Sequence, residues 1–237
     1  MNHLELPSGG LYHEEDLNLL RLMNDYGSIK YDPNGFTLKS GIKSLVYAVL
    51  RADVTDHPDL GVALGRKIAR MVVDNSLNGD MAACLIPIPT AATGMAAAAS
   101  LVSEIEGICT PAGPISYRVM REAVKDHGAG ATNWVNGSYD DKHTYWFVDN
   151  VVTDCKSKLE ARDRLIESGY TVEDMPSLIV VDRQQGGVQN MEKAGFKRIV
   201  TVYNLLDIAY AMGQLKLWPE TVVKSVEEEI TAHQVAV

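Results

Sequence analysis

Hydrophobic residues follow two alternating patterns along the chain. From residue 82 onwards, short apolar runs typical of buried strands alternate with segments whose apolar positions recur every three to four residues. This alternation indicates a mostly parallel sheet with helices on both faces, because parallel strands are buried on both sides and are joined by crossover helices. We therefore predict an α/β fold with a parallel central sheet of about five strands.

The same patterns predict the individual elements. Asp56 is the expected N-cap of a helix that begins near Pro58, and a turn at residues 32–35 leads into a hairpin within residues 36–50. Strands are expected at residues 82–88, 115–120, 145–152, 178–181 and 198–203. Helices are expected at residues 14–26, 58–71, 94–105, 157–167, around 189, 205–213 and 219–233.

Length and composition fit one globular domain. Of the 237 residues, 46% are hydrophobic and 22% are charged, which is ordinary for a soluble protein with a buried core. We expect a single domain over residues 1–237, with residues 1–75 as an N-terminal helix and hairpin region and residues 76–237 as the sheet core and C-terminal helices. The formal net charge of −9 argues against partners such as nucleic acid or anionic membrane.

Cysteine usage and the chain's apolar stretches indicate a cytoplasmic protein. Cys84, Cys109 and Cys155 are odd in number and have no metal-binding spacing, so a reducing compartment is expected. The N-terminus lacks the basic start and apolar core of a signal peptide. Residues 81–103 carry no charge and are long enough to cross a bilayer, but they contain two prolines and a glycine. We predict a buried strand, a turn and a buried helix there instead of a membrane span.

Polar residues at 149–157 follow a hydrophobic strand and lead into a helix. Lys156 and Ser157 fall in the first turn of that helix, where exposed N–H groups and cationic or hydroxyl side chains suit a phosphate group. Asp149 is placed to bind ribose hydroxyls or a metal-bound water. The alternative is that Asp149 and Thr153 merely cap the helix.

A second candidate site follows the strand at residues 178–181. The sequence Asp-Arg-Gln-Gln-Gly-Gly at 182–187 places Arg183 directly after the strand end, and two glycines follow. A guanidinium in this position suits a carboxylate ligand, because the two groups match in charge and hydrogen-bonding geometry. The alternative is a turn held by a salt bridge.

Two more segments carry candidate cations. Residues 121–130 contain Arg121, Lys125 and His127 with glycines and no apolar periodicity, so a mobile loop is expected there. Lys39 lies in the predicted hairpin. The alternatives are a solvated charged loop and an ordinary surface lysine.

Along the chain the four segments follow one another as the Lys39 hairpin, residues 121–130, residues 149–157 and residues 182–187. In this order they resemble the motifs of the type I phosphoribosyltransferases, most closely those of the orotate phosphoribosyltransferases. The resemblance spans roughly residues 36–206 and implies the type I phosphoribosyltransferase fold with an N-terminal hood. It implies Mg²⁺-dependent transfer of ribose 5-phosphate from phosphoribosyl pyrophosphate to orotate, giving orotidine 5′-monophosphate and pyrophosphate in pyrimidine nucleotide biosynthesis. It also implies a homodimer in which loop 121–142 reaches the neighbouring site.

The resemblance also implies a role for each matching residue. Lys125, Arg121 and His127 would stabilise pyrophosphate, and Asp149 would hold the ribose hydroxyls, so these four residues are the expected catalytic group. No residue is assigned as a direct metal ligand. Orotate would be bound by Lys39, Tyr47 and Arg183. Phosphoribosyl pyrophosphate would be bound by Asp149, Asn150, Val151, Val152, Thr153, Asp154, Cys155, Lys156 and Ser157.

Several positions depart from the family pattern. Asn150 stands where a second acid is usual, Cys155 stands in a loop that is normally rich in glycine, and Glu122 replaces a lysine. Asp154 adds a negative charge beside the expected phosphate. These departures support an alternative function, a catalytically weakened phosphoribosyltransferase-like binding or regulatory protein. A further alternative is an enzyme for another nucleobase, against which Arg183 in its six-residue motif argues.

Overall fold

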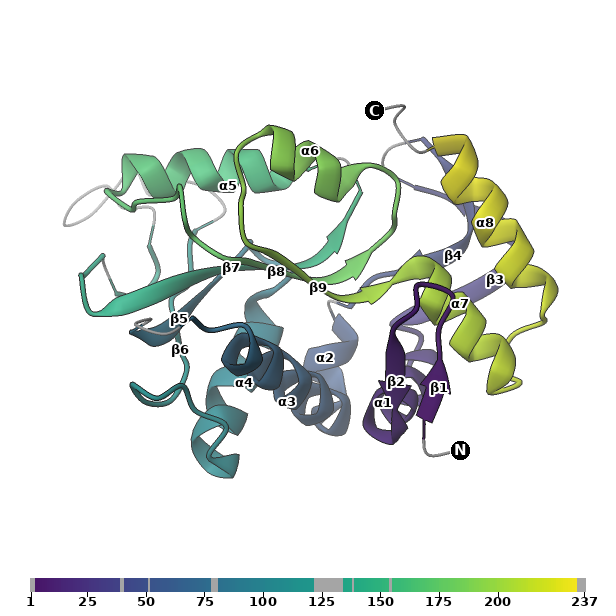
Figure 1. Cartoon of the computed structure of the whole chain (residues 1–237), viewed down its shortest axis with the longest axis horizontal. Coiled ribbons are helices and arrows are strands. Elements are labelled where there is room, and N and C mark those ends of the chain that lie inside the picture. The colour runs from purple at the N-terminus through teal and green to yellow at the C-terminus, as the bar shows by residue number, and fades with distance from the viewer. Residues whose placement is uncertain are drawn as a thin grey trace.

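A five-stranded parallel sheet forms the centre of the molecule (Figure 1). The structure is a computed structural model, which describes residues 3–38, 41–50, 52–77, 81–121, 134–137, 139–153 and 155–233. The strand order is β6-β5-β7-β8-β9, and all neighbours run parallel. Their bounds are β5 (Ala82–Pro87), β6 (Ser116–Tyr117), β7 (His143–Val152), β8 (Ser177–Asp182) and β9 (Ile199–Asn204). The predicted α/β class and parallel sheet are confirmed.

The strands of the sheet are hydrophobic on both faces. Along β7, Tyr145 and Phe147 belong to one core cluster, whereas Trp146 and Val148 between and beyond them belong to the other. Successive side chains of a strand point to opposite faces, so a strand covered on both sides reads as a continuous apolar run. This explains why the central strands stand out in the sequence.

Helices cover each face. Helices α5 (Lys156–Glu167) and α6 (Gly187–Lys193) lie on one side, and α3 (Pro58–Asp74) and α4 (Thr93–Glu106) lie on the other (Figure 1). Small residues allow α3 and α4 to pack closely, since an added Cβ at Gly65 would lie 2.7 Å from the carbonyl carbon of Ala98. The uncharged segment at residues 81–103 is thus β5 and most of α4. No helix in the described part of the chain is long and apolar enough to cross a membrane.

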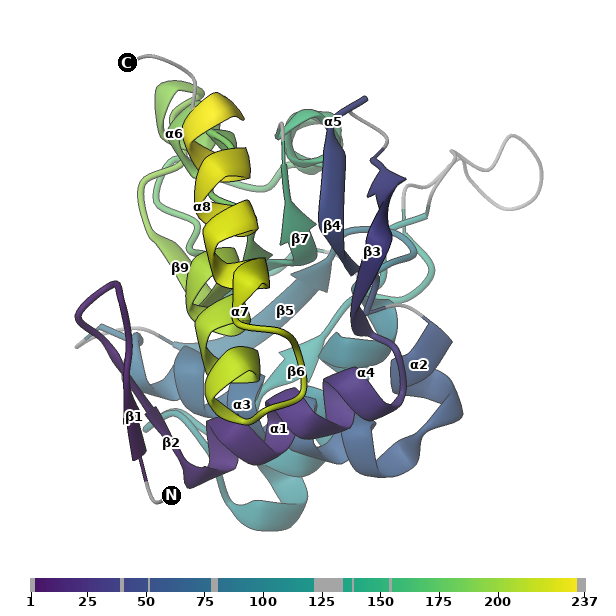
Figure 2. The same cartoon turned by 90° about the vertical axis from the view of Figure 1, so that its right-hand side faces the viewer.

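N-terminal and C-terminal elements meet above the carboxyl ends of the strands. Figure 2 shows the antiparallel hairpin of β3 (Ile29–Thr37) and β4 (Lys43–Ala48) beside the last helix, α8 (Thr221–His233), which packs on β4. Leu20, Val46 and Val226 share one core cluster with the sheet residue Leu178. The remaining elements are β1 (His3–Glu5), β2 (Leu11–His13), α1 (Glu14–Asp25), α2 (Ala52–Asp56) and α7 (Leu205–Gln214).

The structure corrects three local predictions and adds one element. Asp56 does not cap α3, because it ends the short helix α2 and His57 is the N-cap. The expected turn at residues 32–35 is an irregularity inside β3, where the register with β4 shifts between Tyr31 and Phe36. The strand expected at residues 115–120 is reduced to β6, because it pairs with β5 at only two positions. The hairpin of β1 and β2 was not predicted from the sequence.

Candidate active site

Three segments that are far apart in the sequence meet at the carboxyl ends of the strands. Near the end of β7, Asn150 Nδ2 donates a hydrogen bond to the carbonyl oxygen of Val49, just beyond β4, at 2.7 Å. After β8, the backbone N–H of Arg183 donates to the carbonyl oxygen of Val152 at 3.3 Å. The Arg183 guanidinium also donates to the carbonyl oxygen of Val46 in β4, at 3.1 Å. The hairpin of β3 and β4, which we call the hood, and the two strand-end motifs therefore form one region, where open parallel sheets bind ligands.

The loops after β7 and β8 approach too closely for a side chain between them. An added Cβ at Gly187 would lie 2.6 Å from Cγ2 of Val152 and 2.7 Å from the carbonyl oxygen of Thr153. Only glycine allows this approach without displacing backbone. The second glycine of the 182–187 motif therefore has a packing role at the site.

The phosphate-loop candidate turns through a left-handed residue. Cys155 is the N-cap of α5 and has φ of +77°, a conformation that glycine adopts without strain and other residues rarely adopt. Its side chain is buried in the core cluster under α5. Lys156 and Ser157, in the first turn, are exposed. The loop thus keeps a glycine-like backbone although it contains no glycine.

Asp149 is held by a buried lysine that sequence analysis did not identify. Lys158 Nζ lies 2.5 Å from Asp149 Oδ2, and the two side chains are only 5% and 4% exposed. The ammonium also donates to the carbonyl oxygen of Val151 at 2.6 Å. A signal for this lysine existed, because Lys158, Ala161 and Leu165 share the inward face of α5.

Asn150 uses both ends of its amide within the protein. Its Nδ2 reaches Val49, and its Oδ1 accepts the backbone N–H of Val151 at 2.8 Å. The other Asp149 oxygen, Oδ1, accepts the N–H of Asn150 at 2.8 Å. The side chain that replaces the expected second acid therefore links β7 to the hood.

Arg183 is buried at the centre of a second polar network. Its Nη2 donates to Ser44 Oγ and to Glu229 Oε1, each at 2.8 Å, and Gln185 Nε2 donates to the same Glu229 oxygen at 2.6 Å. The side chains of Arg183 and Glu229 are 3% and 7% exposed. Burial lowers the pKa of Arg183, and the Glu229 carboxylate opposes this shift. Within the described chain the buried Arg183 Nε has no hydrogen-bond partner.

Glu229 is a second residue that sequence analysis missed. It lies on α8 among the buried residues Val226 and Ile230, so it faces inward although it belongs to a run of three glutamates. Glu229 follows Val226 by three residues and therefore lies on the apolar side of the helix. This spacing is the signal in the sequence that could have identified Glu229 as buried.

The other predicted site residues are distributed around this region or lie outside the described residues. Tyr47 is 37% exposed on β4 and stacks on Phe36 with ring centroids 5.2 Å apart. Arg121 Nε donates to the carbonyl oxygen of Trp134 at 2.9 Å. Lys39, Lys125, His127 and Asp154 lie outside the described residues, as does Glu122.

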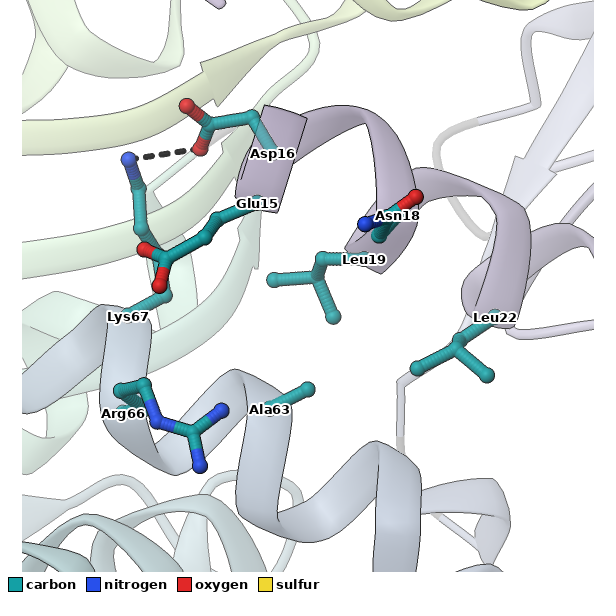
Figure 3. A pocket seen from close by; sticks show the side chains of 8 residues that line it. All are labelled: Glu15, Asp16, Asn18, Leu19, Leu22, Ala63, Arg66 and Lys67. Carbon is teal, nitrogen blue, oxygen red and sulfur yellow. Dashed lines mark ion pairs between the residues drawn. The ribbon is translucent and has the colours of Figure 1, made fainter. Parts of the chain in front are cut away.

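A cavity of about 250 Å³ lies between α1 and α3 (Figure 3). Its charged residues are matched by neighbours, since Lys67 Nζ lies 2.6 Å from Asp16 Oδ1 and Arg66 binds Glu106. None of the sequence-predicted site residues lines it, and we interpret it as a packing gap between helices. Its lining residues are Glu15, Asp16, Asn18, Leu19, Leu22, Ala63, Arg66 and Lys67.

Comparison with known proteins yields similarities in sequence and in fold. No protein-family model matches the chain. An orotate phosphoribosyltransferase of a Nostoc species is 29% identical over 203 residues, which cover 84% of this chain and 90% of that protein. The match to the orotate phosphoribosyltransferase structure of Francisella tularensis covers 95% of this chain and 100% of that chain, with a TM-score of 0.67 and 16% identity.

A longer protein also contains this fold. The structure of Leishmania donovani UMP synthase matches 91% of this chain with a TM-score of 0.71 and 19% identity. The chain spans only 42% of that protein's length. At such identities, the structural matches establish the fold alone.

Proposed function

We propose that this chain, which belongs to the type I phosphoribosyltransferases, transfers ribose 5-phosphate from phosphoribosyl pyrophosphate to orotate. The observation that carries the proposal is the meeting of the hood, the 149–157 motif and the 182–187 motif at one sheet edge. The contacts of Asn150 with Val49 and of Arg183 with Val152 join these segments. The products would be orotidine 5′-monophosphate and pyrophosphate.

The protein's task in this reaction is mainly positioning and charge stabilisation. An electron-poor ribosyl carbon separates from a leaving pyrophosphate, so cationic donors and fixed geometry lower the barrier. Asp149 would accept hydrogen bonds from the ribose hydroxyls. The backbone and side chains of residues 153–157 would hold the 5′-phosphate at the start of α5. Arg121, Lys125 and His127 would bind the pyrophosphate.

The base would bind between the hood and Arg183. Tyr47 is available for packing on a ring, and the remaining Nε–H of Arg183 is a donor for a base carbonyl or carboxylate. Glu229 already balances the guanidinium charge. Lys39 would then supply much of the positive charge that attracts the orotate carboxylate.

The residues at the end of β7 do not fit the Mg²⁺ ion that the resemblance implies. Both oxygens of Asp149 and the amide of Asn150 are engaged within the protein. Among the residues that the structure describes, no three His, Cys, Asp or Glu side chains form a metal cluster. Any Mg²⁺ in the reaction would be held by substrate oxygens and water, a common mode for this ion.

We extend the proposal to assembly and location. The chain would act as a homodimer in which loop 121–142 serves the neighbouring site. The resemblance implies that this loop carries the pyrophosphate-binding cations and places them in the active site of the other subunit. Its three cysteines are free, which suits a reducing cytoplasm.

The decisive experiment is an orotate-consumption assay with phosphoribosyl pyrophosphate and Mg²⁺. Stoichiometric formation of orotidine 5′-monophosphate and pyrophosphate is the expected result. Adenine, uracil and hypoxanthine serve as alternative acceptors, and turnover with one of them but not with orotate would contradict the proposed substrate.

A weakened or regulatory binding protein is the second candidate. The internal pairing of Arg183 with Glu229 and of Asp149 with Lys158 favours it, because both groups expected to contact substrate already have charged partners. Isothermal titration distinguishes this candidate, which would bind phosphoribosyl pyrophosphate without turning over orotate.

A further inference from the structure

Lys158 occupies an unusual position for a lysine. It belongs to the first turn of α5 and points into the protein, with its residue only 4% exposed. A cation near a helix N-terminus is opposed by the helix dipole, and a buried ammonium loses its hydration. Its contacts with Asp149 Oδ2 and the carbonyl oxygen of Val151 offset these costs. The geometry ties the lysine to the carboxylate that the proposed function assigns to the ribose hydroxyls.

The pair changes the charge at the end of β7. The formal charges of the Asp149 and Lys158 side chains sum to zero, and Asn150 is neutral. These three side chains therefore carry no net formal charge. An unpaired carboxylate here would repel the anionic phosphate and pyrophosphate groups of a substrate. A cation beside the carboxylate removes that repulsion.

We propose that Lys158 is a positioning residue that supplies, within the protein, the positive charge that a divalent cation would otherwise provide beside Asp149. Phosphoribosyl pyrophosphate would then bind with little dependence on Mg²⁺. The inference rests on the proposed function, since it assumes that Asp149 faces this substrate. It explains together the neutral Asn150, the engaged Asp149 oxygens and the buried ammonium.

The test is calorimetric titration of phosphoribosyl pyrophosphate into the full chain, with excess Mg²⁺ and again with EDTA. In the natural protein the two dissociation constants should differ by less than about threefold, whereas in Lys158→Met binding should be at least about tenfold weaker in EDTA, as expected for an uncompensated buried charge. The ratio of the two constants is the readout. A purely structural lysine would leave that ratio unchanged.

Three variants serve as controls. Lys156→Met removes an exposed cation from the same helical turn and should weaken binding equally in both conditions. Lys158→Arg keeps the charge and should keep the natural ratio. The double variant Asp149→Asn with Lys158→Met removes both charges, so it should bind weakly but with a low metal dependence. Thermal unfolding verifies that each variant is folded.

The outcomes separate the inference from the function on which it rests. If the natural protein binds phosphoribosyl pyrophosphate with Mg²⁺ but not in EDTA, the proposed role of Lys158 is overturned and the proposed function remains. This outcome needs only the natural protein, so it holds even if Lys158→Met does not fold. An unchanged ratio in folded Lys158→Met likewise overturns that role and leaves the function in place. A natural protein that binds no phosphoribosyl pyrophosphate in either condition overturns the proposed function itself.

Discussion

At the scale of single residues, Cys155 holds a conformation that suits glycine better. Its φ of +77° disfavours any side chain with a Cβ, while its buried thiol contributes to the core under α5. The two effects oppose each other, so the natural residue is a compromise between backbone strain and burial.

Comparing Cys155→Gly with Cys155→Ala isolates the strain. Both variants lose the thiol, but only glycine relaxes the left-handed backbone, so Cys155→Gly should be the more stable by about 1 kcal/mol. Chemical denaturation measures the difference. At an ordinary position the order is reversed, and a more stable alanine variant would show that the loop does not hold this conformation.

Glu229 balances the charge of Arg183, the residue proposed to bind the base. In Glu229→Gln the amide oxygen still accepts from Arg183 and Gln185, but the guanidinium charge is no longer balanced. We expect orotate to bind at least about threefold more tightly, since an anionic ligand gains a charge-assisted partner. Stability should fall, because a buried cation loses its counter-ion.

Glu228→Gln is the matched control for this titration. Glu228 is the neighbouring residue on α8, its side chain is 70% exposed, and it faces Lys224. Its substitution should leave orotate affinity unchanged. Equal effects of the two substitutions would mean that general charge, and not the contact with Arg183, determines the change.

At the scale of elements, the close packing of α6 on the loop after β7 depends on Gly187. The Cβ of Gly187→Ala would meet the Thr153 carbonyl at 2.7 Å, so α6 and the phosphate loop must move apart. The expected cost is about 1–3 kcal/mol of stability, which is typical of overpacking. Binding of phosphoribosyl pyrophosphate should weaken about tenfold as the loop shifts.

Gly213→Ala provides the control for this substitution. Gly213 lies within α7, and its Cβ would approach nothing closer than Val223 Cγ2 at 3.8 Å. This variant should be equally or slightly more stable, by up to about 1 kcal/mol, with unchanged affinity. An affinity loss in Gly213→Ala as large as that in Gly187→Ala would contradict a local effect.

At the scale of the whole molecule, the proposed dimer makes a prediction about mixed subunits. Lys125→Ala should impair the loop donated to the neighbouring site, and Gly187→Ala should impair the subunit's own phosphate site. Mixing the two impaired variants creates hybrid dimers with one intact site. At substrate concentrations where each variant alone has little activity, the mixture should recover about a quarter of the natural level after random exchange. An active protein that is monomeric by light scattering rules out shared sites.

The sequence by itself determined the central sheet and most of its helices. Runs such as the one around Trp146 and Phe147 are apolar on both faces, and the spacing of Leu60, Leu64 and Ile68 follows a helix, so local patterns report the final burial directly. It also ordered the four motifs along the chain. The 149–157 and 182–187 segments each follow a predicted strand, and parallel strands end at one edge of the sheet, so their location at the same edge follows from topology.

Only the tertiary structure decided how the charges of the site are paired. Lys158 and Glu229 read locally as surface residues, and their roles depend on Asp149 and Arg183, which are distant or on other elements. Likewise, β6 is short because it pairs with β5 at only two positions, which depends on the neighbouring strand. Hydrophobic periodicity encodes which face is buried, but a buried charge is stabilised by a specific partner that the chain brings into contact only when it folds.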